Sequence, residues 1–262
     1  MVNDKKKRRR RTEGFATALA CLAALSAVGV AVPLAILSGG LTSPPPSSRF
    51  IVPAWVAEVE ARLQRRGFEG LTLSYAGRIL TANGQAAGRG AAGSAFAAVK
   101  AALAAQPEAR DGFDILVNNI AVDGEAAVGA AFARLTAVPD VPACQQAFLD
   151  TLAGRLVGFE VGSARINADS AELLDALAAV AKRCEAHRIE IAGHTDLSGS
   201  PSRNLLLSED RATAVRDYFM QRGVSVSSLS AAGYGDTRPL APERTPAADA
   251  RNRRIEFTVR GL

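Results

Sequence analysis

Residues 189–200 read IEIAGHTDLSGS, and residues 204–215 read NLLLSEDRATAV. The first stretch opens with two isoleucines at alternate positions, which is typical of a β-strand with one buried face, and continues into a glycine-containing loop. In the second stretch we expect a helix that begins at Ser208, because serine caps helices well and the two acidic residues after it would complement the helix dipole. Together they predict a strand, a loop and a helix in direct succession.

The same alternation extends to both sides of these stretches. Residues 156–159 are expected to form a strand, residues 171–182 an amphipathic helix, and residues 255–259 a final strand with alternating apolar side chains. Strands separated by helices form a sheet covered by those helices. We therefore expect an α/β (α+β) domain over residues 140–262, a β/α/β/α/β sandwich with its helices on one face of the sheet.

A smaller unit is expected over residues 54–130. Its apolar residues change between helical spacing and strand alternation, and glycines mark the turns. The expected order is α-β-β-α-β, with a helix from Trp55 that stops at Gly67, strands at 71–75 and 79–82, a helix at 91–105 and a strand at 114–122.

The N-terminal segment has the pattern of a membrane anchor. Seven basic residues occupy Lys5–Arg11, and Gly14–Leu37 contains no charged residue. At about 1.5 Å per residue, a helix over this stretch would span a hydrocarbon core of ~30 Å. Because basic flanks remain cytoplasmic, we expect a cytoplasmic tail at 1–13, a transmembrane helix at 14–38 in contact with membrane lipid, and a periplasmic location for the rest.

Residues 39–53 are rich in Gly, Ser and Pro, which indicates a spacer. Two alternatives to a permanent anchor remain, a cleaved signal peptide and a lipoprotein acylated at Cys21. The apolar stretch is longer than the ~7–15 residues of a signal peptide, and it continues well beyond Cys21. Both observations favour the anchor.

The net charge of +5 comes from the N-terminus. Of 31 lysines and arginines, seven lie in Lys5–Arg11, which leaves 24 basic residues against 26 acidic ones. No basic surface is expected beyond the tail, so we do not expect a nucleic-acid partner.

Four ordered motifs carry a family resemblance. The two stretches quoted first are followed by GYGDTRP at residues 233–239 and RNRRIEF at residues 251–257. Together they resemble the OmpA-like peptidoglycan-binding domain. The resemblance implies a non-enzymatic envelope protein that binds the cell wall non-covalently, through the diaminopimelate of the peptide stem, and tethers the membrane to it. A pore-forming, transport-associated or stress-related envelope component, or a cleaved member of the family, is the alternative.

The resemblance also implies site residues. An aspartate and an arginine at the positions of Asp196 and Arg211 hold the diaminopimelate in the family, Asn204 matches a further contact, and Thr195 and Leu207 would shape the pocket. The chemistry agrees, because diaminopimelate ends in an ammonium and a carboxylate. An aspartate suits the first group, and a guanidinium fork, assisted by the N-terminus of its helix, suits the second.

The sequence departs from the family pattern at one place. A family asparagine in the loop after the first strand corresponds here to Gly162, which puts one ligand hydrogen bond in doubt. Arg253 and Arg254 are expected to be structural or to lie at the rim of the site.

Residues 54–130 resemble the BON domain, a small module of bacterial envelope proteins, by pattern rather than by a sharp motif. The resemblance implies contact with phospholipid or with envelope proteins. A packed spacer domain without a ligand is the alternative.

Catalytic and metal chemistry find no support in the sequence. His187 and His194 are the only histidines, and neither lies in a metal-ligand motif. No nucleophile motif of the G-x-S-x-G type is present, which disfavours an envelope hydrolase. We expect packed or hydrogen-bonded histidines, no cofactor and no metal.

Three cysteines are present, and one of them, Cys21, lies in the expected anchor. Cys144 and Cys184 bracket the first strand and helix of the C-terminal domain, and an oxidising periplasm would allow them to pair. Some actinobacterial members of the family resemble this arrangement. We therefore predict a structural Cys144–Cys184 disulfide, with two separate buried thiols as the alternative.

Overall fold

The computed structural model describes residues 52–123, 125–136 and 138–262. The expected cytoplasmic tail and transmembrane helix, and nearly all of the spacer, lie outside these residues. Within them, no helix combines the length and the apolar character needed to cross a bilayer.

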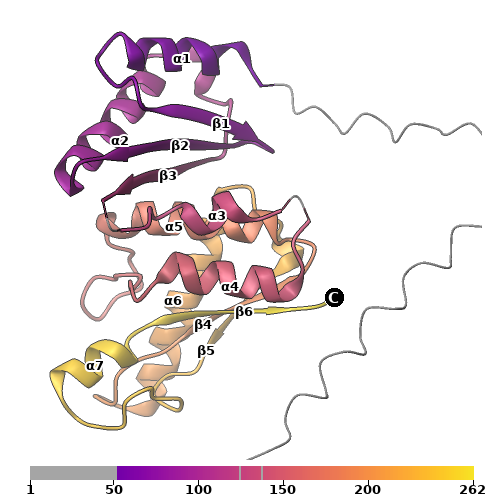
Figure 1. The fold of residues 1–262 in the computed structure, drawn as a ribbon. Coiled ribbons are helices and arrows are strands. Elements are labelled where there is room, and N and C mark those ends of the chain that lie inside the picture. Colours follow the sequence, from indigo (N-terminus) through magenta and orange to yellow (C-terminus); the bar gives the residue numbers. More distant parts are fainter. Residues whose placement is uncertain (1–51, 124, 137) are drawn as a thin grey trace, which may run out of the picture. The chain divides into compact units, whose positions relative to one another are not determined.

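The first half of the described chain contains a three-stranded sheet (Figure 1). Strands β1 and β2 are antiparallel, and β2 and β3 are parallel and joined by a crossover helix. The elements are α1 (Ala54–Gln64), β1 (Thr72–Ala76), β2 (Ile79–Ala86), α2 (Arg89–Ala104) and β3 (Ile115–Val122). The predicted order of α-β-β-α-β is confirmed.

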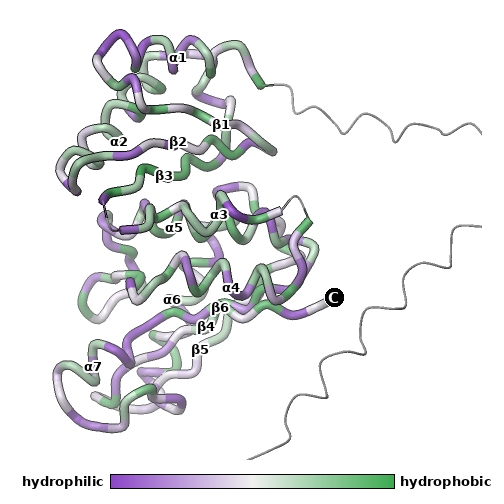
Figure 2. Tube along the Cα trace, in the orientation of Figure 1, coloured by the Kyte–Doolittle hydropathy of each residue, from purple (hydrophilic) through white to green (hydrophobic). Residues whose placement is uncertain are grey.

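Both faces of this sheet are covered. Helices α1 and α2 pack on one face around Trp55, Val59 and Leu80. On the other face, Ile115 and Val117 of β3 belong to the same buried cluster as the helices of the second half. Figure 2 accordingly shows β3 as largely hydrophobic, which is typical of a strand buried on both sides.

The second half contains another three-stranded sheet, with the order β5-β4-β6. Strand β4 is parallel to β5 and antiparallel to β6. Helix α6 packs on β4 and β5, helix α4 packs on β6, and α5 lies against α4, α6 and β3. The elements are α3 (Ala130–Arg134), α4 (Val141–Leu152), α5 (Ala171–Arg183), β4 (Arg188–Gly193), α6 (Pro201–Gln221), β5 (Leu229–Gly233), α7 (Pro246–Asn252) and β6 (Ile255–Arg260).

The α/β class is confirmed, but two expected elements differ from the structure. The strand expected at residues 156–159 is absent, since Phe159 makes only an isolated antiparallel bridge with Ile166. The structure instead has a strand that was not expected, β5, which pairs with β4 and whose residues, LSAAG, gave no strand pattern in the sequence.

The start of α6 is a second correction. The helix begins at Pro201, not at Ser208, because Ser200 accepts a hydrogen bond from the Arg203 amide and proline is favourable in the first turn. Ser208 is fully buried inside the helix, and its hydroxyl donates to the Leu205 carbonyl. The apparent cap at Ser208 is therefore an internal serine.

The predicted disulfide is present. It joins Cys144 in α4 to Cys184 at the C-terminal end of α5, with Cα atoms 5.9 Å apart. Both residues are fully buried, so the bond ties together two helices of the second core.

Candidate ligand-binding site

The carboxyl ends of β4 and β5 bring the site together. Gly193 and Gly233 end these strands and are paired in register. A side chain on either glycine would overlap the α6 backbone at Ser208 and Glu209. The two glycines therefore let α6 lie directly against the strand ends, which places Arg211 of α6 near the loop that follows β4.

Asp196 lies in that loop and is mostly buried, with 17% of its side chain exposed. One carboxylate oxygen accepts from the Ser198 amide at 3.0 Å, and the other pairs with the Arg253 guanidinium at 2.8 Å. Burial alone would raise the pKa of Asp196, but the bonds from Arg253 and Ser198 outweigh it and hold that pKa below its ordinary value. The carboxylate is therefore ionised at neutral pH.

Arg211 lies in the interior of α6 and is only 8% exposed. Its Nε donates to the Ser163 carbonyl at 3.0 Å, and its guanidinium lies over the Phe159 ring, 5.1 Å from the centroid. No carboxylate of the described residues approaches it within 4.0 Å. Burial is the main cause that lowers the pKa of Arg211, followed by the charge of Arg253, while Asp196 acts in the opposite direction.

The N-terminus of the helix was expected to assist Arg211 in binding the ligand carboxylate, and this expectation is wrong. Because α6 begins ten residues before Arg211, the free amides of its N-terminus are about 15 Å along the helix axis from that residue. The neighbours of Arg211 are instead a backbone carbonyl and an aromatic ring.

A cavity of about 200 Å³ opens beside Arg211. Its walls include Phe159, Arg211, Arg253 and Arg254, and His194 also lines it. Arg253 pairs with Asp196 and also lines the cavity that Arg211 lines. This arginine connects the two charges that the sequence singled out.

The other three predicted site residues belong to the same region. The Asn204 amide donates to the Ser198 carbonyl at 2.9 Å and to Asp236 at 3.3 Å, and the Thr195 hydroxyl donates to the Asp196 carbonyl at 3.0 Å. Both side chains are buried and hold the loop after β4 in shape, whereas Leu207 is half-buried on α6. Direct contact of these three residues with a ligand stays a prediction.

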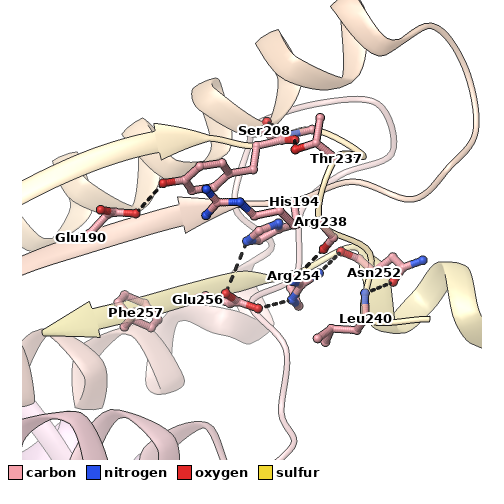
Figure 3. A network of polar contacts seen from close by, with 12 residues as sticks. Glu190, His194, Ser208, Thr237, Arg238, Leu240, Asn252, Arg254, Glu256 and Phe257 are labelled. Atoms are coloured by element: carbon pink, nitrogen blue, oxygen red, sulfur yellow. Dashed lines mark hydrogen bonds and ion pairs between the residues drawn. The ribbon is translucent and has the colours of Figure 1, made fainter. Parts of the chain in front are cut away.

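His194 is packed, with 1% of its surface exposed, and its ring stacks on Tyr234 with centroids 5.5 Å apart. Figure 3 shows it beside Glu256, which also pairs with Arg254. Burial, and then the charge of Arg254, lower the pKa of His194 to about 4 despite the opposing effect of Glu256. The imidazole is therefore neutral at neutral pH.

His187 bonds the Pro139 carbonyl through Nε2 at 2.9 Å. Across the described ranges, no three acidic, histidine or cysteine side chains gather as a metal site would require.

Sequence reasoning missed three partners of the site. Arg253 was expected to be structural or at the rim, yet it is the ion-pair partner of Asp196. Phe159 and Ser163, which contact Arg211, lie in a segment expected in part to be a strand. Gly162 lies just before Ser163 and adopts a left-handed conformation with φ +65°. This glycine is the sequence signal that could have indicated a turn at the segment that contacts Arg211.

Comparison with known proteins identifies this part of the chain. Residues 158–253 match the sequence profile of the OmpA family. They form an OmpA family domain. Its boundaries include Phe159, Asp196, Arg211 and Arg253.

Individual relatives match over limited lengths. The peptidoglycan-binding protein ArfA of Mycobacterium tuberculosis is 34% identical over 146 residues, which cover 55% of this chain and 42% of ArfA. Outer membrane porin F of Pseudomonas fluorescens is 43% identical over 74 residues, 28% of this chain and 23% of the porin. The chain thus spans less than half the length of either protein.

Among solved structures, the peptidoglycan-associated lipoprotein of Burkholderia pseudomallei aligns with 32% identity. The alignment covers 42% of this chain and 92% of the lipoprotein, with a TM-score of 0.39.

Proposed function

We propose that the OmpA family domain binds peptidoglycan non-covalently, by holding the diaminopimelate of the peptide stem between Asp196 and Arg211. One observation carries the proposal. Arg211 is a buried cation without an acidic partner among the residues described, and it lines a cavity. A buried guanidinium needs an anion to offset its lost hydration, so the cavity favours a carboxylate ligand.

The neighbouring charge makes the ligand a zwitterion. Asp196 is ionised, and its present partner is a half-exposed arginine that a ligand ammonium can replace. An ammonium and a carboxylate on one carbon, as at the free end of diaminopimelate, satisfy Asp196 and Arg211 together. The relative ArfA, whose name describes it as peptidoglycan-binding, supports the same ligand class.

The rest of the chain completes the proposal. A transmembrane helix at Gly14–Leu37 anchors the protein in the membrane, and the domain at residues 140–262 holds the wall from the periplasmic side. Residues 54–130, with a BON-like order of elements, provide a surface for an envelope protein or phospholipid. The protein acts as a tether and catalyses no reaction.

A sacculus-binding assay tests the proposal. Full-length protein in detergent is mixed with purified diaminopimelate-type sacculi, and bound protein is measured after sedimentation. Asp196→Ala and Arg211→Ala should each reduce binding at least tenfold, which corresponds to about 1.4 kcal/mol. Arg216→Ala is the matched control, because Arg216 lies on the same helix and, within the part of the chain that the structure describes, pairs only with its neighbour Asp217. Wild-type retention of both site variants would refute the assignment.

A further inference from the structure

We propose that Arg253 exchanges ion-pair partners when the ligand binds. In the free protein it holds Asp196, and in the complex it passes to a second carboxylate of the peptide stem. The inference rests on the proposed function and deepens it, because it makes Arg253 a residue that selects among stem peptides by their charge.

The position of Arg253 allows this exchange. Its Nη1 lies 2.8 Å from the Asp196 carboxylate, yet 47% of its side chain is exposed. It extends from the C-terminal end of α7, and it also lines the cavity beside Arg211. A partly exposed arginine has the rotamer freedom to leave one carboxylate for another at small cost.

The charges of the site require a second carboxylate. Arg254, which also lines the cavity, is already paired with Glu256 at 2.6 Å. Of the charged side chains that line the cavity or pair with a lining residue, Asp196, Arg211 and Arg253 remain. Their sum is +1. A zwitterion adds no net charge, and it displaces Arg253 from Asp196, which leaves a guanidinium unpaired at the cavity wall. One further carboxylate on the ligand restores neutrality.

The cavity has room and suitable chemistry for that group. Its volume of about 200 Å³ exceeds the need of a single carboxylate, and it is lined by Arg211, Arg253 and His194. Both ring nitrogens of the buried His194 lack a hydrogen-bond partner among the described residues, and a Glu256 oxygen lies 3.5 Å from Nε2. A neutral imidazole can donate one hydrogen bond to a ligand oxygen.

The experiment is a cycle of ligands and variants measured by isothermal titration calorimetry. The ligand is the synthetic stem tripeptide L-alanyl-γ-D-glutamyl-diaminopimelate, used unmodified and with each of its three carboxylates amidated in turn. The proteins are full-length wild type, Arg253→Gln, and Arg251→Gln as an exposed control on the same helix. Amidation removes a charge and keeps the shape of the group.

Amidation of one carboxylate outside the zwitterionic end should weaken wild type and Arg251→Gln roughly fivefold, and leave Arg253→Gln unchanged. The exchange is refuted if neither of those two amidations weakens wild type, or if Arg253→Gln loses as much as wild type does. Failure of the proposed function looks different. In that case, amidation of the carboxylate at the zwitterionic end would leave the affinity of every protein unaffected.

Discussion

Opening the Cys144–Cys184 disulfide should destabilise the protein strongly. The bond joins two fully buried residues on α4 and α5, with a sequence separation of 40. The chain-entropy model gives a stabilisation of about 4 kcal/mol for a closed loop of this length. For a folded unit of roughly 200 residues, each kcal/mol shifts the melting temperature by about 2–4 °C. Reduction should therefore lower the melting temperature by about 8–16 °C.

The assay compares oxidised and reduced protein by circular dichroism melting in a Cys21→Ala background, which removes the third thiol. Reduction turns the disulfide into two thiols and removes no side-chain heavy atom, so no cavity is created in the comparison. A Cys144→Ala/Cys184→Ala variant is the control, and its melting temperature should not respond to reductant. The reasoning is refuted if oxidised and reduced protein melt within 2 °C of each other, or if both thiols are free for alkylation in unreduced protein.

Three further predictions concern the site and its support. Burial lowers the pKa of His194 from 6.5 to about 4, so between these pH values the unfolded state binds more protons than the folded state. The free energy of unfolding is therefore highest above pH 6.5 and should fall by on the order of 3 kcal/mol as the pH falls toward 4. Urea titrations should find this loss absent in His194→Gln. Gly193→Ala would push α6 away at Ser208, so calorimetric melting should show a loss of about 1–3 kcal/mol together with weaker sacculus binding, and unchanged binding would contradict the close approach. Asn252→Ala removes three hydrogen bonds to Leu240 and Ala241, and urea unfolding should show a loss of about 3 kcal/mol, whereas a loss under 1 kcal/mol would mean that this loop is held elsewhere.

The sequence predicted the elements that have strong periodicity. The helix at 171–182, the strand around Ile189 and Ile191, and the order of the first five elements agree with the structure, because each buries a regular apolar stripe. β5 was not predicted, because it is covered by α6 and paired with β4 and has no apolar alternation of its own. Small residues such as Ala231 allow this close packing but give no strand pattern in the sequence.

The site was predictable as a set of residue types and not as a set of contacts. Asp196 and Arg211 were expected to hold the two charged groups of one ligand, which stays a prediction, but their neighbours in the protein were not foreseen: the aspartate pairs with Arg253 and the arginine lies over Phe159. These contacts join segments more than 40 residues apart, and no local pattern encodes them. The apparent N-cap at Ser208 misled for a related reason, since its hydroxyl accepts from the distant Gly235 amide.

The most direct test of diaminopimelate recognition compares two stem tripeptides that differ only at the third residue. Diaminopimelate carries an ammonium and a carboxylate at its free end, whereas lysine carries the ammonium alone. Isothermal titration calorimetry of the full-length protein should show binding of the diaminopimelate peptide at least tenfold tighter than of the lysine peptide. Arg211→Ala should abolish this preference, because Arg211 is the buried cation that the carboxylate satisfies. Equal affinity of the wild-type protein for the two peptides would contradict a site built on Asp196 and Arg211.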